Sequence, residues 1–184
     1  KLSSVFSVRP DLLGLRVLAG LKVRSGEAIL RAVADLLARN GIRLLDCRTH
    51  MEEVLAPRCS APRGKLKYDL ELALRAARSL AALEAGQTVV VKNGVIVALE
   101  GLEGTDACLR RGAQVAGKGC SAVKVCSPRG DFRFDVPTLG PRTIRTLKAG
   151  GFRAIGVEAG KAFLIGGSSL IDQAKRAGIN IYGL

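Results

Sequence analysis

The sequence predicts an α/β protein in which a mixed β-sheet is flanked by helices. Amphipathic helical patterns alternate with short apolar runs along most of the 184 residues, which is the rhythm of α/β units. In the run 88–101, TVVVKNGVIVALEG, two apolar stretches flank Asn93-Gly94. Asn-Gly favours the type I′ turn of a β-hairpin, so this is the clearest local prediction.

The first third of the chain is expected to contain two helices and one strand. Apolar residues at helical spacing over 12–24, with Arg16, Lys22 and Arg24 among them, predict a basic amphipathic helix. Such a helix packs on a domain core, the interpretation we favour, or lies on a membrane surface. A second helix is expected over 26–41, ended by Asn40-Gly41, and a strand over 42–47.

Residues 56–65, with two prolines and a glycine, are the best candidate for a boundary. Beyond them, glycines, a proline and short apolar runs mark the expected elements. The helices are expected over 68–86, 105–117, 138–150 and 169–178. The strands are expected within 88–101, 122–126, 153–165 and 179–184. Thr105 is expected to cap the helix that it begins.

Composition narrows the possible functions. The net charge of +13 favours anionic partners such as nucleic acid, acidic lipid or a phosphorylated substrate. No apolar tract reaches the length of a membrane span. The five cysteines are irregularly spaced and contain no C-x-x-C pair, so a zinc site or disulfide framework is not expected and a reducing cytoplasm fits better. A Ser-His or Cys-His nucleophilic site would need His50, which we interpret as a surface residue.

The stretch RGDFRFDVP, residues 129–137, is a candidate metal site. In an extended strand, Asp131, Arg133 and Asp135 would share one face, because alternate side chains point the same way. Two carboxylates suit Mg²⁺, which takes oxygen ligands, and Arg133 between them suits a phosphate. The alternative is a solvated edge strand whose charges balance one another.

The helix expected after this stretch begins near Thr138, Pro141 and Arg142. Free backbone N–H groups and the positive end of the helix dipole would face an anion there, and Arg142 and Arg145 would reinforce the attraction. The alternative is a capped helix with a rigid proline at its entry.

A second acidic cluster lies between the hairpin and the next helix, where α/β proteins often place their sites. Glu100, Glu103 and Asp106 recur at intervals of three residues, and Thr105 could touch a phosphate. Plain capping charges are the alternative. Among the lysines, Lys124 lies within an apolar strand, where a cation needs an anion or a water-filled cleft. With no competent nucleophile, this chemistry points to metal-assisted attack of water on phosphorus.

Three segments together resemble one family: VVVKNGVIVALEGLEGTDACLRR, RFDVPTLGPRTI and AIGVEAGKAFLI. They are similar, in order, to the C-terminal domain of the LpxI-type UDP-2,3-diacylglucosamine pyrophosphatases of Gram-negative bacteria. The resemblance covers residues 57–184, which it implies to be a catalytic domain. Residues 1–56 resemble the end of the family's N-terminal α/β domain, whose glycine-rich beginning is not in this sequence.

The resemblance implies hydrolysis of UDP-2,3-diacylglucosamine to UMP and lipid X in lipid A biosynthesis, with Mg²⁺ or another divalent cation. It implies catalytic or metal-binding roles for Asp106, Asp131 and Asp135. Substrate or supporting roles follow for Glu103, Thr105, Lys124, Arg133, Thr138, Arg142 and Lys161. A cytoplasmic homodimer, peripheral at the inner membrane, is expected.

Two other functions are weighed against this one. A nucleic-acid-binding protein would explain the charge, but aromatic residues make up only 4% of the chain and no RNP-like or zinc-finger spacing occurs. We therefore expect no nucleic-acid partner. A module that binds a nucleotide sugar or lipid without turning it over is the other alternative.

Overall fold

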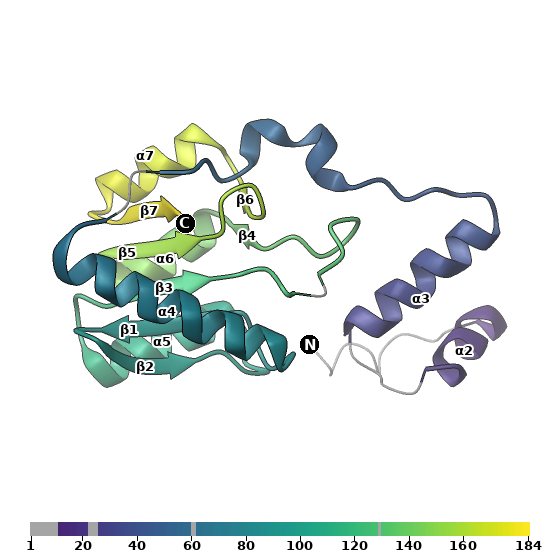
Figure 1. Ribbon diagram of the computed structural model, residues 1–184, viewed down its shortest axis with the longest axis horizontal. Helices are drawn as coiled ribbons and strands as arrows, with labels where there is room; N and C mark the ends of the chain where they lie inside the picture. The colour runs from purple at the N-terminus through teal and green to yellow at the C-terminus, as the bar shows by residue number, and fades with distance from the viewer. Residues whose placement is uncertain (1–10, 22–25, 60–61, 129) are drawn as a thin grey trace. The chain divides into compact units, whose positions relative to one another are not determined.

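The computed structural model describes residues 11–21, 26–59, 62–128 and 130–184 (Figure 1). The chain divides into two compact units. The smaller unit comprises residues 1–49 and 131–135, and the larger unit comprises residues 50–130 and 136–184. In the described part of the chain, no helix is both long enough and apolar enough to cross a membrane.

Both helices expected in the smaller unit are present, as α2 (Leu12–Ala19) and α3 (Gly26–Arg39). The Asp11 carboxylate caps α2 by accepting from the N–H of Gly14 at 2.7 Å. Helix α3 ends as predicted at Asn40-Gly41, where Gly41 has a φ of 76°. The first helix stops before residue 24, and residues 22–25, with Lys22 and Arg24, lie outside the described residues.

Two extended segments expected in this unit are not strands. Residues 42–46 have no regular secondary structure and lead into a 3₁₀ turn, η1 (Cys47–His50). Asp131–Asp135 forms a turn, in which the N–H groups of Phe134 and Asp135 donate to the carbonyl of Asp131 at 3.0 and 2.8 Å. The described part of this unit holds no strand with which either segment could pair. The shared strand face proposed for Asp131, Arg133 and Asp135 is therefore wrong.

The larger unit contains the expected mixed sheet, with five strands in the order β2-β1-β3-β5-β7. Their bounds are β1 Thr88–Lys92, β2 Val95–Leu99, β3 Ser121–Lys124, β5 Ala154–Val157 and β7 Asn180–Gly183. Strands β3, β5 and β7 are parallel, and β1 is antiparallel to both β2 and β3. Asn93 and Gly94 have φ of 49° and 79°, so the predicted hairpin turn is confirmed.

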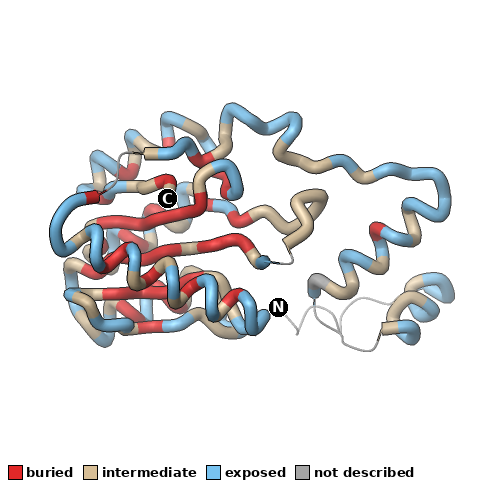
Figure 2. Tube along the Cα trace, viewed as in Figure 1, coloured by how far each residue is buried: buried red, intermediate tan, exposed pale blue. Residues whose placement is uncertain are grey.

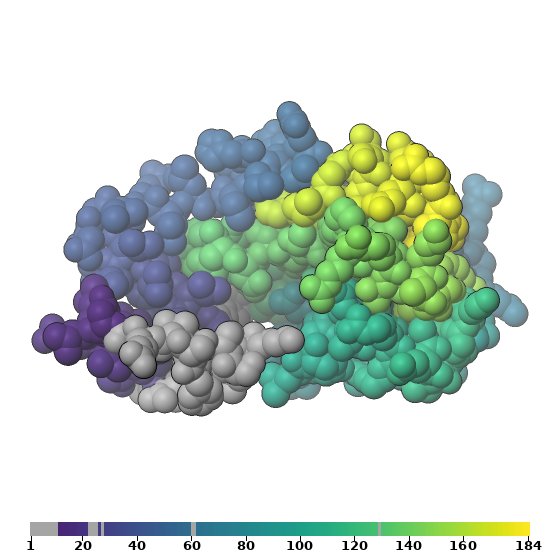
Figure 3. Space-filling view, turned by 180° about the vertical axis from the view of Figure 1, so that it is seen from behind, coloured from purple at the N-terminus to yellow at the C-terminus, as the bar shows by residue number. Residues whose placement is uncertain are grey.

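Helices cover both faces of this sheet (Figures 1 and 2). Helix α4 (Gly64–Ala82) packs on one face, over Val89, Val91 and Val123. The other face is covered by α5 (Thr105–Ala116), α6 (Pro141–Ala149) and α7 (Ser168–Arg176). Figure 3 shows this side of the larger unit, with α5 in teal, α6 in green and α7 in yellow. The bounds of all four helices lie within four residues of the predicted ones.

Three short elements complete the larger unit. A 3₁₀ turn, η2 (Glu52–Val54), precedes α4. Strands β4 (Thr138–Leu139) and β6 (Phe163–Leu164) form a separate parallel pair. The strand–turn–strand expected over 153–165 is thus present as β5 and β6, but β6 pairs with β4 and lies outside the main sheet.

The strand register brings the ends of several strands to one edge of the sheet. Lys124 at the end of β3 pairs with Val157 at the end of β5, which in turn pairs with Gly183 of β7. Thr88, the first residue of β1, lies opposite Lys124. Ligands of open α/β sheets bind at the carboxyl ends of the parallel strands, so this edge is where a site is expected.

Candidate functional site

The acidic cluster after β2 lies at this carboxyl edge and is built around the start of α5. Gly104, with a φ of 81°, precedes the helix, so Thr105 is its first residue and makes no capping bond. The hydroxyl of Thr88 donates to that of Thr105 at 3.3 Å, and Thr105 donates to Oε1 of Glu100 at 3.1 Å. The predicted cap is wrong because Gly104 occupies the cap position and the Thr105 hydroxyl donates to Glu100, five residues earlier.

Asp106 lies in the first turn of α5 and is mostly buried. Its Oδ2 is 2.6 Å from Nε of Arg142, the second residue of α6, whose side chain is 78% exposed. The two helix starts are thereby linked by an ion pair. Arg142 was expected to hold an anion near the start of α6, and in the structure it pairs with a carboxylate.

Two carboxylate oxygens of this cluster are buried without a hydrogen-bond partner among the described residues: Oε2 of Glu100 and Oδ1 of Asp106. A buried, unpaired carboxylate oxygen is costly unless a cation approaches it. Both are the hard oxygen donors that Mg²⁺ prefers, and Mg²⁺ needs only one or two carboxylates because it keeps several waters. The described residues contain no group of three or more His, Cys, Asp or Glu side chains placed to hold a metal, and these two oxygens are the candidate cation ligands of the cluster.

Glu103 is engaged by its neighbours. Its Oε1 is 2.5 Å from Nη2 of Arg111, and its Oε2 accepts from the N–H of Gly101 at 3.0 Å. The hydrogen bond from Arg111 holds the pKa of Glu103 below its usual value. These contacts brace the loop between β2 and α5, which carries Glu100.

A fourth carboxylate at the carboxyl edge, Glu158, follows β5 and is buried. Its Oε1 accepts from Nη2 of Arg78 on α4 at 2.9 Å, and its Oε2 accepts from the N–H of Cys126 at 3.0 Å. Nζ of Lys161, a predicted substrate residue, lies 3.9 Å from the same carboxylate. Sequence reasoning did not select Glu158 or Arg78, although an acid directly after the apolar strand AIGV was a usable signal.

The remaining predicted residues of the larger unit are Lys124 and Thr138. Lys124 is half-buried and ends β3 at the carboxyl edge. The hydroxyl of Thr138 donates to the carbonyl of Val136 at 3.0 Å, just before α6. Lys124 therefore lies at the edge where a site is expected, and Thr138 supports the entry to the helix.

Asp131 and Asp135 belong to the smaller unit, whereas Asp106 belongs to the larger one. Both carboxylate oxygens of Asp131 accept from Arg133, with Nε at 2.8 Å from Oδ1 and Nη2 at 2.5 Å from Oδ2. This hydrogen bonding lowers the pKa of Asp131 below its usual 3.8. Asp131 therefore stays ionised at neutral pH. Arg133, expected to bind phosphate, is paired with a carboxylate, as Arg142 is.

Asp46 and Arg48 repeat this arrangement in the same unit. Nη2 of Arg48 lies 2.6 Å from Oδ2 of Asp46, and the pairing lowers the pKa of Asp46. The N–H of Cys47 donates to the carbonyl of Phe132 at 3.1 Å, so the two Asp-x-Arg turns lie against each other. Sequence reasoning missed the contact between the two turns, because no local pattern shows that residues 46–48 and 131–133 meet.

Comparison with known proteins finds matches over nearly the whole chain. The LpxI N-terminal domain family matches residues 1–54, and the LpxI C-terminal domain family matches residues 57–182. The UDP-2,3-diacylglucosamine pyrophosphatase LpxI of Caulobacter vibrioides is 32% identical over 193 residues, which span 97% of this chain and 69% of that protein.

Two solved structures show only a weak likeness. One is the apo dCMP deaminase of cyanophage S-TIM5, at 14% identity and a TM-score of 0.39, over 62% of this chain and 95% of that one. The other is RibD of Acinetobacter baumannii, at 17% identity and a TM-score of 0.40, over 64% of this chain and 35% of that one. Scores this low support no conclusion about function. The matches to both domain families and to the Caulobacter protein establish that this chain belongs to the LpxI family.

Proposed function

We propose that this protein hydrolyses the pyrophosphate bond of UDP-2,3-diacylglucosamine, releasing UMP and lipid X in lipid A biosynthesis. The observation that carries the proposal is the match, over 97% of the chain, to a pyrophosphatase named for that substrate. The site supports it chemically, because cationic side chains and buried carboxylates lie together at the carboxyl edge of the sheet. We also propose that it works as a homodimer in the cytoplasm, at the inner membrane surface. The net charge of +13 favours attraction to that anionic surface.

The carboxylates suit a divalent cation such as Mg²⁺. In the larger unit, Glu100 and Asp106 would hold it through the two oxygens that have no hydrogen-bond partner among the described residues. Bound there, the ion would polarise a phosphoryl oxygen and lower the pKa of a water. Asp131 and Asp135 remain proposed catalytic or metal-binding residues, and the lowered pKa of Asp131 suits a group that acts as a permanent anion.

The arginines suit an exchange of partners. Arg142 pairs with Asp106, and Arg133 pairs with Asp131. A diphosphate offers each guanidinium a more highly charged, bidentate partner. We propose that substrate binding draws the arginines from their carboxylates to the phosphates. Each carboxylate is then free for the cation or the attacking water.

The test is direct. The purified chain is incubated with UDP-2,3-diacylglucosamine and Mg²⁺, and UMP release is followed by chromatography. We expect steady UMP and lipid X formation that EDTA abolishes and added Mg²⁺ restores. UMP release no faster than in a protein-free control would contradict the proposal and favour a binding module without turnover. Release that EDTA does not reduce would leave the reaction in place but exclude the cation.

A further inference from the structure

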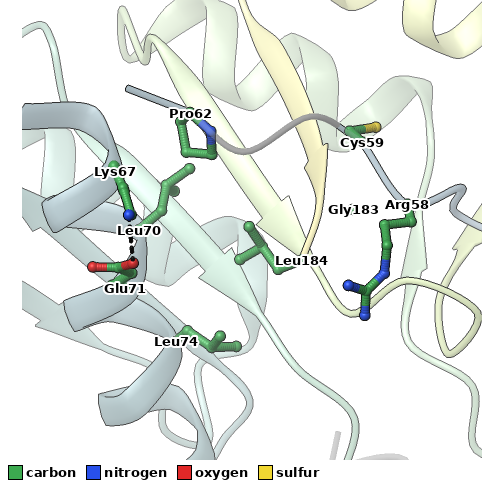
Figure 4. Close-up of a pocket in the computed structure, with 9 residues that line it drawn as sticks. All are labelled: Arg58, Cys59, Pro62, Lys67, Leu70, Glu71, Leu74, Gly183 and Leu184. Atoms are coloured by element: carbon green, nitrogen blue, oxygen red, sulfur yellow. Dashed lines mark ion pairs between the residues drawn. The ribbon is translucent and has the colours of Figure 1, made fainter. Parts of the chain in front are cut away.

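A groove of about 330 Å³ lies beside α4 in the larger unit (Figure 4). Leu70 and Leu74 of α4 form one wall. Pro62 lies beside Leu70, Cys59 and Arg58 lie on the opposite side, and Leu184 after β7 lies between the two sides. Most of the surface that these residues present to the groove is apolar. None of them has a role in the proposed site.

The groove exists because one helix covers this face of the sheet only in part. The apolar residues of α4 pack with those of β1 and β3, including Val89 and Val123. At the far edge of the sheet, Tyr182 and Leu184 stay half-buried. An apolar surface left open beside a helix is a place for an apolar ligand.

The wall opposite α4 is fixed to the sheet at its carboxyl end. The N–H of Cys59 donates to the carbonyl of Gly183 at 3.1 Å. A Cβ at Gly183 would lie 1.8 Å from the carbonyl oxygen of Pro57, so only glycine lets the two segments approach so closely. Cys59 is therefore fixed beside the end of β7, and a side of the groove that is already in place reduces the cost of binding.

The charged side chains of the groove are suited to an anionic ligand. Arg58 and Lys67 are exposed on either side of it. Lys67 lies 3.8 Å from Glu71, and both side chains are 56% exposed, so this pair is weak and readily exchanged. Arg58 follows Pro57, which touches the end of β7, so a cation lies where the groove meets the carboxyl edge.

Helix α4 connects the groove with that edge. Lys67, Glu71, Leu74 and Arg78 recur at intervals of four, three and four residues and so share one stripe of the helix. Arg78 bonds Glu158 at the carboxyl edge, where Lys161 also lies. A chain in the groove would therefore extend from the same edge as the phosphate-binding cations.

We propose that this groove binds one acyl chain of an anionic lipid, with the phosphate at the carboxyl-edge end near Arg58. That the lipid is the diacylated nucleotide sugar rests on the proposed function, whereas the groove itself does not. The chain packs along Leu70, Leu74 and Leu184.

Cys59 provides a readout that does not depend on activity. The probe is dodecyl phosphate below its micelle concentration, and the reaction is alkylation by N-ethylmaleimide, with each cysteine quantified by mass spectrometry. Cys108, Cys120 and Cys126 are buried, and burial raises the pKa of Cys108 to about 12. Cys47, half-buried in the smaller unit, serves as the internal control.

At about ten times its dissociation constant, dodecyl phosphate should slow alkylation of Cys59 about tenfold. Inorganic phosphate at the same concentration should not slow it, because the chain supplies the binding energy. Cys47 should react equally fast in all samples. Equal rates for Cys59 with and without dodecyl phosphate, or equal slowing of both cysteines, would overturn the groove.

Leu74→Trp fills the groove at a half-buried position, and Leu83→Trp, at a 78% exposed position just after the same helix, is the matched control. Leu74→Trp should remove the protection of Cys59, whereas Leu83→Trp should keep it. The preference in kcat/KM for UDP-2,3-diacylglucosamine over its diacetyl analogue should fall about tenfold in Leu74→Trp, the loss of about 1.4 kcal/mol of chain binding. Leu74→Ala replaces it if the tryptophan variant does not fold.

The results separate the groove from the reaction. Protection of Cys59 without UMP release in the wild-type protein would contradict the proposed function and leave the groove standing. UMP release without protection of Cys59, or with the same chain-length preference in Leu74→Trp as in Leu83→Trp, would contradict acyl-chain binding in the groove and leave the proposed function in place.

Discussion

The guanidinium carbon of Arg48 lies 3.5 Å from the centre of the Phe132 ring. This contact joins the two Asp-x-Arg turns of the smaller unit, together with the hydrogen bond from the Cys47 N–H to the Phe132 carbonyl. Asp131 is the residue directly before Phe132. The segment around Arg48 is therefore what holds the Asp131 turn in place.

Removing the ring should loosen this turn locally. A cation over an aromatic face contributes about 0.5–1 kcal/mol where it is partly exposed. We expect Phe132→Leu or Arg48→Ala to speed hydrogen exchange of the Cys47 amide about two- to fivefold, by the same conversion of free energy to rate. The double variant should add little to either single change, because each removes the same contact. Additive effects would show that Arg48 and Phe132 act independently.

The pairing of Asp131 with Arg133 predicts a pH dependence. The hydrogen bonds lower the pKa of Asp131 in the folded protein, so its ionised form is favoured by folding. The stabilisation is present at pH values above the usual 3.8 and is lost as the pH falls through the lower, folded-state pKa. Arg133→Met should move the pKa of Asp131 up toward its usual value.

NMR titration of the carboxyl carbon of Asp131 measures this shift. The matched control is Arg48→Met, which removes the neighbouring Asp-x-Arg pair and should move the pKa of Asp46 far more than that of Asp131. A pKa for Asp131 that is the same in the Arg133→Met variant as in the wild-type protein would show that another group keeps it ionised. Arg31, whose charge also lowers this pKa, would be the next to replace.

The sequence predicted the elements whose signals are local. The hairpin turn needs only Asn93-Gly94, and α4 needs only its run of strong helix formers up to residue 82. The strands predicted at 42–47 and 131–136 are wrong because alternation of apolar residues does not supply a neighbouring strand. An extended chain without one leaves its backbone groups unpaired, and here they bond within turns.

The sequence predicted several charged residues of the candidate site but not which of them pair with each other. The local spacing singled out Asp106 and Arg142, which are 36 residues apart in the sequence and form an ion pair in the structure. Nothing in the sequence pairs α4 with the end of β5, so the Arg78–Glu158 contact was missed. Ion pairs between distant segments depend on the packing of helices on the sheet, which local patterns do not specify.

Asp106 and Arg142 should contribute unequally to turnover. Asp106→Ala should lower kcat at least about 100-fold, because it removes a candidate cation ligand and its transition-state stabilisation. Arg142→Ala should raise KM or lower kcat by about tenfold, because a charged hydrogen bond to phosphate contributes about 1.5–3 kcal/mol. Steady-state kinetics of UMP release measure both.

Lys148→Ala is the control for Arg142, because Lys148 lies in the last turn of the same helix and carries the same charge. It should leave both constants within about twofold, as expected for a charge away from the substrate. Equal losses in Arg142→Ala and Lys148→Ala would indicate a general effect of charge. Wild-type kcat in Asp106→Ala would remove Asp106 from the proposed chemistry.

Asp69 should be the most sensitive charged residue for stability in the larger unit. Its side chain is 1% exposed, and it accepts from the N–H groups of Asn93 and Gly94 at 3.2 and 2.6 Å. Arg153 also pairs with it and lies 3.1 Å from the hydroxyl of Ser121. One buried carboxylate thus holds the hairpin turn, α4 and the start of β5 together.

Asp69→Ala leaves a guanidinium and two turn N–H groups without their acceptor, so it should lower the free energy of unfolding by about 3–5 kcal/mol. Glu71→Ala, also on α4, removes only an exposed ion pair and should cost less than about 1 kcal/mol. Urea denaturation followed by circular dichroism compares the two. A loss in Asp69→Ala no larger than in Glu71→Ala would mean that water replaces the carboxylate at no cost, and that the turn is held by its own backbone conformation.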